Sequence, residues 1–305
     1  MPCFYGLVRS VFGLVLLFVL TSGCAVPGKK VFVRGMEKSF KPGTIISAQK
    51  AAPITFEQLI SELENARVVF VGERHTNIEH HNLQLEIIRA LYKGHPDLKI
   101  GMEMFDHTYQ PVLDKWSRGE LTEDEFLKQT HWYANWKFNY GLYRDILAFA
   151  REKNIPVVGL NIPFHIPSKI SIGGIGSLSE YEKAQLPEKI TTDIEAHRKY
   201  VKEIFEQHHL KGREDFENFY MAQNVWEDAM AEAVVRHLGN SLMVVLAGNG
   251  HIVEKFGIPD RVSRRLPVPV KTIYPVSAGA TVELSYADFI IVTEQPKHPP
   301  VMAGH

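Results

Sequence analysis

Apolar runs of strand length recur along this chain and alternate with amphipathic stretches. Six such runs are found, at residues 68–72, 99–104, 156–160, 243–247, 270–274 and 289–293. Continuous apolar runs of this kind are typical of strands buried on both faces of a sheet. Residues 77–92 and 140–153, which lie between them, carry apolar side chains at helical spacing. The order predicts an α/β fold with a mostly parallel sheet flanked by helices and joined by right-handed crossovers.

The segment between the third and fourth runs has no strand pattern. It shows helical periodicity over residues 180–210 and 214–238. We therefore expect a helical insertion over residues 165–238 that caps the carboxyl-terminal edge of the strands. The α/β domain is expected to span residues 55–295, with a short tail at 296–305. Residues 24–54 are rich in Lys, Gly and Pro, which predicts a tether with at most a short hairpin.

The first 23 residues have the pattern of a bacterial lipoprotein signal peptide. One cation, Arg9, precedes the apolar run VFGLVLLFVL, which is too short to span a bilayer. Small residues then lead into Cys24, the expected lipidation site. Ala25 follows instead of Asp, so we expect attachment to the outer membrane of a bacterial cell envelope. The alternative is an ordinary secretory signal in which Cys24 occurs by chance.

Cysteine content and charge exclude several classes of protein. The only two cysteines, Cys3 and Cys24, lie at the start, so the rest of the chain can form no thiolate metal site. The chain carries 34 basic and 35 acidic side chains. This balance excludes bulk binding to nucleic acid, which requires a basic face to neutralise phosphates.

Polar side chains follow the predicted strands at the edge where ligands bind in open α/β sheets. Glu73 and His75 follow the first strand, Glu103 lies in the second, Asn161 ends the third and His251 follows the fourth. Each residue alone is weak evidence, because strand-end polar groups often serve as caps. Two GxxH sequences with a glutamate at the same edge predict a functional cluster.

The residue types in this cluster allow two kinds of chemistry, and their spacing does not decide between them. Imidazole and carboxylate can act as general acid and base near neutral pH. Histidine with glutamate can also hold a divalent ion. The catalytic candidates are Glu73, His75, Glu103 and His251, and the metal-binding candidates are His75, His80, Glu103 and His251. Glu79 and His81 are expected on a solvated helix face.

Aromatic residues gather in two segments, residues 131–143 (HWYANWKFNYGLY) and 218–226 (NFYMAQNVW). They could stack on a planar ligand and offer a phenolate or imidazole to a metal centre. The alternative, which composition alone favours, is that they pack the helical cap against the sheet.

Five ordered segments resemble one known family over roughly residues 56–270. They are GERHTNIEHHNLQLEII, GMEMFDHTYQPVLDKW, IPVVGLNIP, AQNVWEDAMA and VVLAGNGHIVEKFGIPDR. The chain resembles the ChaN-like haem-binding uptake lipoproteins of the Tiki superfamily. This resemblance implies an iron-regulated lipoprotein of α/β fold that binds haem, with a dimer enclosing paired haems. It also implies a tyrosine as iron ligand with histidine assisting, for which the candidates are Tyr133, Tyr140, Tyr220 and His131.

The resemblance carries one departure and one competing function. The expected Trp-Asp-Glu of the Gln-x-x-Trp helix is here Trp226-Glu227-Asp228, which leaves open which acid turns towards the cleft. Related members of the superfamily, the Tiki proteases and erythromycin esterases, use the GxxH histidines and the glutamates for hydrolysis. We therefore hold two hypotheses: a membrane-anchored protein that binds haem or iron for uptake or storage, and a cell-envelope hydrolase.

Overall fold

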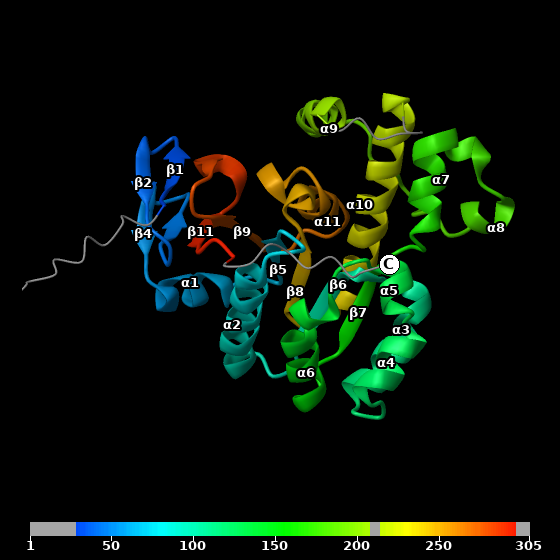
Figure 1. The fold of residues 1–305 in the computed structure, drawn as a ribbon, viewed down its shortest axis with the longest axis horizontal. Helices are drawn as coiled ribbons and strands as arrows, with labels where there is room; N and C mark the ends of the chain where they lie inside the picture. Colours follow the sequence, from blue (N-terminus) through cyan, green and yellow to red (C-terminus); the bar gives the residue numbers. More distant parts are fainter. Residues whose placement is uncertain (1–28, 208–213, 297–305) are drawn as a thin grey trace, which may run out of the picture.

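The computed structural model describes residues 29–207 and 214–296 (Figure 1). Its main sheet has eight strands in the order β4-β3-β11-β9-β5-β8-β6-β7. Six of them run parallel: β5 (Val68–Glu73), β6 (Lys99–Asp106), β7 (Val157–Asn161), β8 (Met243–Gly248), β9 (Val270–Ser277) and β11 (Phe289–Thr293). The predicted α/β fold with a mostly parallel sheet is confirmed. The expected leader 1–23, the lipidation site Cys24 and residues 297–305 lie outside the described residues.

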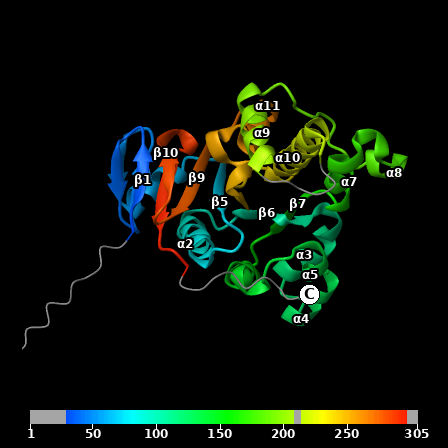
Figure 2. The same ribbon diagram turned by 45° about the horizontal axis from the view of Figure 1, so that its top comes forward.

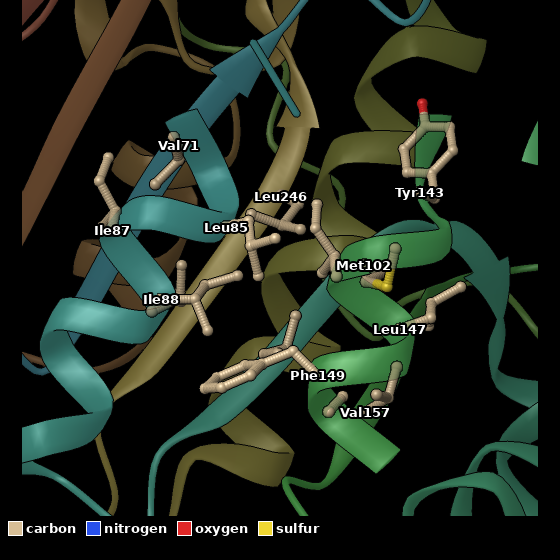
Figure 3. Packing of buried hydrophobic residues seen from close by; sticks show 14 of the residues in the cluster. Val71, Leu85, Ile87, Ile88, Met102, Tyr143, Leu147, Phe149, Val157 and Leu246 are labelled. Carbon is tan, nitrogen blue, oxygen red and sulfur yellow. The ribbon is translucent and has the colours of Figure 1, made fainter. Parts of the chain in front are cut away.

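Helices cover both faces of this sheet (Figures 1 and 2). On one face, Val69 and Val71 of β5 pack with α1 (Phe56–Leu63), α2 (Ile78–Gly94), α3 (Gln110–Ser117), α4 (Glu123–Gln129) and α6 (Arg144–Glu152). Figure 3 shows the centre of this cluster, where Ile87 and Ile88 approach the sheet from α2. On the other face, Val68 and Phe70 pack with α10 (Phe216–Leu238) and α11 (Ile258–Arg265). The alternation of side chains along a strand supplies both faces with apolar groups.

The strand order brings the carboxyl ends of β5, β8 and β6 together. After β7 the chain passes through a helical segment and returns as β8, which inserts between β5 and β6. Glu73 pairs in register with Gly248, and Met102 pairs with Leu246. Segments far apart in the sequence therefore end side by side at one edge.

The helical insertion contains α7 (His165–Gly173), α8 (Glu180–Lys183), α9 (Glu195–Gln207) and α10. Its expected continuous helix over 180–210 is instead two helices, because residues 184–194, which include Pro187, are not helical. The carboxyl-terminal half of α10, including Met230 and Val234, packs on the sheet face. The insertion thus caps the strand edge with α7, α9 and the first half of α10. The second half of α10 covers one face of the main sheet.

Residues 31–54 differ from the expected tether, because they form four short strands. β1 (Val31–Arg34) and β2 (Lys38–Phe40) join β10 (Thr281–Glu283) in a separate sheet, whereas β3 (Ile45–Ser47) and β4 (Ala52–Ile54) extend the main sheet antiparallel. Val31, Val33 and Ile46 are buried together with residues of β9 and β11. The folded unit therefore begins near Val31 and not at residue 55.

Local signals in the sequence set several helix starts. Thr55 and Thr122 form capping boxes at the starts of α1 and α4, and Asn77 caps α2. The short helix α5 (Trp132–Asn135) follows α4. Within the described residues, no helix combines the length and apolarity needed to cross a membrane.

Candidate functional site

The four strand-end residues of the predicted cluster come together in the structure. His75 Nδ1 donates to Glu73 Oε1 at 2.7 Å, and His251 Nε2 lies 3.5 Å from Glu103 Oε1. The two pairs meet at Gly248, where a Cβ atom would lie 3.1 Å from His75 Cε1 and 3.6 Å from Glu103 Oε2. A side chain at position 248 would therefore contact the His75 ring more closely than is usual, and glycine leaves room for the two pairs to approach.

Glu73 is held by three further side chains from the helix layer. Tyr143 donates its hydroxyl hydrogen to Glu73 Oε1 at 2.5 Å, and Gln84 Nε2 donates to Oε2 at 2.8 Å. His81 Nδ1 lies 3.4 Å from Oε2. Burial would raise the pKa of Glu73, but the nearby His81 and the hydrogen bond from His75 outweigh it and lower the pKa to about 2. The carboxylate is therefore ionised at neutral pH.

The expectation that His81 lies on a solvated helix face is wrong. His81 is buried, and its ring contacts Tyr143 and His75 O besides Glu73. The first turn of α2 faces the strand ends because Asn77 caps the helix directly beside β5. Glu79, two residues earlier, is half-buried.

His251 is placed between two carboxylates. Besides Glu103 it contacts Glu227 of α10, with Nδ1 3.2 Å from Oε1. Burial would lower the pKa of His251, but Glu103 and Glu227 outweigh it and raise the pKa to about 10. Burial would raise the pKa of Glu103, but the nearby His251 outweighs burial and lowers that pKa. Glu103 Oε2 also accepts from Gly248 N at 2.7 Å. The imidazolium and its carboxylates form a charged, hydrogen-bonded set at neutral pH.

A second layer of buried charges lies under Glu227 and settles which acid of the Trp226-Glu227-Asp228 segment faces the cleft. Glu227 contacts His251 with one oxygen, while the other lies 3.1 Å from His197 and 3.2 Å from Arg261. Asp228 turns the other way, because it accepts from Thr191 N and pairs with Arg265. Glu227 is thus the acid of the cleft.

Two adjoining cavities lie beside the cluster and share Phe138, Phe219 and Gln223. The first, which we call the polar cavity, has a volume of about 600 Å³ and is lined by Glu73, His75 and His251 of the cluster together with Tyr200 and Val201 of α9. The second, the aromatic cavity, has a volume of about 400 Å³ and is lined by α7, α10 and the segment 135–138. Both volumes lie in the range of ligand pockets. His75 stands at their junction, packed against Trp136 and Phe138.

The rings of the aromatic segments divide between the buried core and the wall of a cavity. Trp132 and Tyr143 are buried in the core under the helix layer. Trp136 and Phe138, from the same segment, line the aromatic cavity together with Phe164, Phe219 and Trp226. The indole N–H of Trp226 has no acceptor among the described residues.

The metal candidates do not all converge. His80 Nδ1 accepts from Arg74 N at 2.9 Å, so this histidine holds the turn after β5 and does not contact Glu103 or His251. Burial lowers the pKa of His80 to about 3, which keeps its ring neutral. Within residues 29–207 and 214–296, no group of three or more His, Cys, Asp or Glu side chains has a geometry that could hold a metal ion.

The haem-ligand candidates differ sharply in accessibility. Tyr140 is 1% exposed and its hydroxyl has no hydrogen-bond partner in the described part of the chain, while Tyr220 is 3% exposed. Tyr133 is 54% exposed and lies on α5 two residues before Asn135, which lines the aromatic cavity. His131, also exposed, precedes the same helix in a left-handed conformation.

Replacing Tyr143 by Phe is expected to lower the free energy of unfolding by about 1.5–3 kcal/mol, because a hydrogen bond to a buried carboxylate is lost. Tyr140→Phe is the matched control, since the Tyr140 hydroxyl has no partner among the described groups. That control should change stability by less than about 0.5 kcal/mol. Urea unfolding followed by circular dichroism measures both, and equal effects would contradict the role given to Tyr143.

Sequence reasoning missed Tyr143, Gln84, Gln223 and the buried His197 and Arg261. Three of them offered a signal. Gln84 falls within the first resembling segment, and Gln223 and Arg261 fall within the last two. Tyr143 ends the aromatic segment 131–143, but nothing in that segment sets it apart from the other rings, and no motif marks His197.

A sheet with a His–Glu cluster at its strand ends and an aromatic cavity beside it defines a ligand-binding α/β protein. The chain belongs to the ChaN family, haem-binding uptake proteins of the Tiki superfamily, whose family model matches residues 59–262. This membership supports haem binding. No curated protein matches the chain.

One solved structure supports the fold, and two others are more distantly similar. The structure of cofacial haem binding to ChaN of Campylobacter jejuni is similar, with a TM-score of 0.66 and 20% identity over 81% of this chain and 95% of that one. An erythromycin esterase, EreC, has a TM-score of 0.48 and 13% identity over 77% of each chain. The type III effector HopBA1 has a TM-score of 0.47 and 14% identity over 78% of this chain and 92% of the other. Likenesses as weak as the last two say nothing about the activity of this chain.

Proposed function

We propose that the protein is a lipid-anchored haem-binding protein of the bacterial cell envelope that acts in haem or iron uptake or storage. Membership of the ChaN family carries this proposal. It is supported by the aromatic cavity, whose five rings can stack on a flat macrocycle. The leader pattern and Cys24 support the anchor and the outer-membrane address.

The residues around the aromatic cavity fit haem in two respects. Trp136, Phe138 and Trp226 supply apolar contact, and the exposed Lys137 supplies a cation for carboxylates at its edge. Haem, when bound, would supply the iron centre, and axial ligation by tyrosine is one of the known modes of holding it.

Among the three tyrosine candidates, we assign the iron ligand to Tyr133, with His131 assisting. Its side chain is exposed on α5, the helix whose last residue, Asn135, lines the aromatic cavity, whereas Tyr140 and Tyr220 are buried and would have to move. Cofacial haem binding is described for the Campylobacter jejuni ChaN. An exposed ligand suits that arrangement here, because a second copy of this chain could cover it and complete a homodimer around paired haems.

Hemin titration tests the function. The purified protein should develop a saturable Soret band, and Tyr133→Phe should shift or abolish it. Tyr140→Phe and Tyr220→Phe are matched controls and should leave the spectrum unchanged. Tyr200→Phe is a further comparison, because Tyr200 lines the polar cavity. A change only in Tyr200→Phe would overturn the assignment of Tyr133, and the absence of any saturable band would overturn haem binding.

The anchor is tested separately by mass spectrometry of the protein isolated from membranes. Acylation of Cys24 should be found, and Cys24→Ser should abolish it. An unmodified amino terminus at another residue would contradict the anchor without affecting haem binding. Hydrolysis by Glu73, His75, Glu103 and His251 stays a prediction from the sequence. Among the described residues, no contact favours hydrolysis over haem binding.

A further inference from the structure

A basic hairpin stands next to the proposed lipid attachment site. Residues 29–41 hold five basic side chains and one acidic side chain, although the whole chain has a net charge of −1. The basic residues are all exposed, namely Lys29, Lys30, Arg34, Lys38 and Lys41. They lie in or beside β1 and β2, whose inward residues Val31, Val33 and Phe40 fix the hairpin to the body.

The pairing of the two strands gathers three lysines at one end of the hairpin. Val31 pairs with Phe40 in antiparallel register, and Lys30 and Lys41 are the next residues outward on the two strands. Lys29 precedes Lys30, and its side chain lies near Gly279. Within the residues that the structure describes, no ion pair neutralises this end, and Arg34, at the other end of β1, pairs with Glu283 at 2.8 Å. The acidic residues closest in the chain or sheet are Glu37, in the hairpin turn, and Glu294, after β11.

This end of the hairpin is also the end that leads to Cys24. Lys29 is five positions after Cys24, so their Cα atoms are at most about 18 Å apart. An acyl chain on Cys24 would therefore hold the three lysines close to the bilayer surface. Electrostatic attraction acts over a Debye length of about 8 Å in physiological salt.

We infer that the lysine end of the hairpin, formed by Lys29, Lys30 and Lys41, is a docking surface for anionic phospholipid headgroups. This inference rests on the proposed lipid anchor at Cys24. A single lipid attachment is reinforced by a basic patch, and each lysine near an anionic surface strengthens binding about fivefold. Half-buried Phe32 lies on the outer face between Lys30 and Arg34 and adds an apolar contact.

Docking through this surface leaves the candidate site accessible. Figures 1 and 2 place β1 and β2 at one end of the molecule and α7 and α8 at the opposite end. The aromatic cavity is lined by α7, so it faces away from the bilayer and stays open to haem or to a second copy.

The first experiment uses Cys24 itself, which is the only cysteine after residue 3. The chain from Cys24 onward is coupled through this thiol to a maleimide lipid, in vesicles of phosphatidylcholine alone or with phosphatidylglycerol. Amine labelling of Lys29, Lys30 and Lys41 should be about fivefold slower on the anionic vesicles and recover in high salt. Labelling of Lys93, Lys115 and Lys128 should not differ. Equal labelling of the lysine end on both vesicles would overturn the docking surface. Because the coupling supplies the lipid, this result does not depend on whether Cys24 is acylated in the cell.

The second experiment measures vesicle sedimentation of the uncoupled chain carrying Cys24→Ser. Reversing Lys29, Lys30 and Lys41 to Glu should weaken binding to phosphatidylglycerol vesicles roughly 100-fold. The matched control reverses Lys93, Lys115 and Lys128, which are exposed on α2, α3 and α4 and give the same change in net charge. Equal losses of vesicle binding in the two variants would attribute binding to net charge and overturn the docking surface. Complete displacement of the protein from the vesicles by millimolar inorganic phosphate would also overturn it. Circular dichroism verifies that both variants are folded.

Discussion

The variant Arg261→Met is expected to lose about 3–5 kcal/mol of its free energy of unfolding, because it removes the fully buried cation that two buried carboxylates share. Arg261 is fully buried on α11. Its guanidinium lies 3.2 Å from Glu227 and 3.2 Å from Asp228, and it donates to Phe256 O at 2.7 Å and Gly257 O at 3.0 Å. The side chain therefore joins α10 to α11 under the candidate site.

Arg264→Met is the matched control for this prediction. It lies one turn along the same helix, pairs with Asp260 and is 41% exposed, so its loss should cost less than about 1 kcal/mol. Urea unfolding at pH 7 measures both variants. The double variant Arg261→Met with Glu227→Leu should recover part of the loss, since removing both partners leaves fewer unpaired charges. Equal stability of the two methionine variants would contradict the bridging role of Arg261.

The sheet and the four-residue cluster could be predicted from the sequence for a physical reason. A strand buried on both faces must be apolar throughout, as in Val68–Val71. Such a strand gives a continuous apolar run that can be recognised in the sequence. Parallel strands end at one edge, so Glu73, Glu103 and His251 could be placed together without knowing the strand order.

The first four strands could not be predicted, because strands of three or four residues give too few alternations to define a period. β1 shows Val31 and Val33 buried, but Gly35 and Pro42 bound the hairpin and resemble the composition of a tether. β1 and β3 each pair with a local strand and also with β10 and β11, which are more than 200 residues away in the sequence. Local pattern therefore cannot place them in their sheets.

The second layer of the site escaped prediction for another reason. Helical spacing of apolar residues shows which face of a helix is buried. The same spacing does not show whether a polar residue near that face is buried or lies at its solvent-exposed boundary. His81 shows the problem, because it follows the buried His80 and precedes the exposed Asn82. Its burial depends on Glu73 and Tyr143, which approach from β5 and from the start of α6.

Stability should also fall as pH rises from 7 to 10, by roughly 4 kcal/mol, because of His251. Burial would lower the pKa of His251, but Glu103 of β6 and Glu227 of α10 raise it from 6.5 to about 10. The folded state thus keeps a proton that the unfolded chain loses above pH 6.5, so this contribution is fully present below pH 6.5 and is lost as pH rises through 10. His251→Gln removes the titrating group, and its free energy of unfolding should be nearly constant over the same range, even if lower at pH 7. Urea unfolding of both proteins at four pH values from 7 to 10 gives the two slopes. Parallel slopes would show that His251 is not a buried imidazolium between two carboxylates, and the site would then hold a neutral ring that can accept a proton from a ligand.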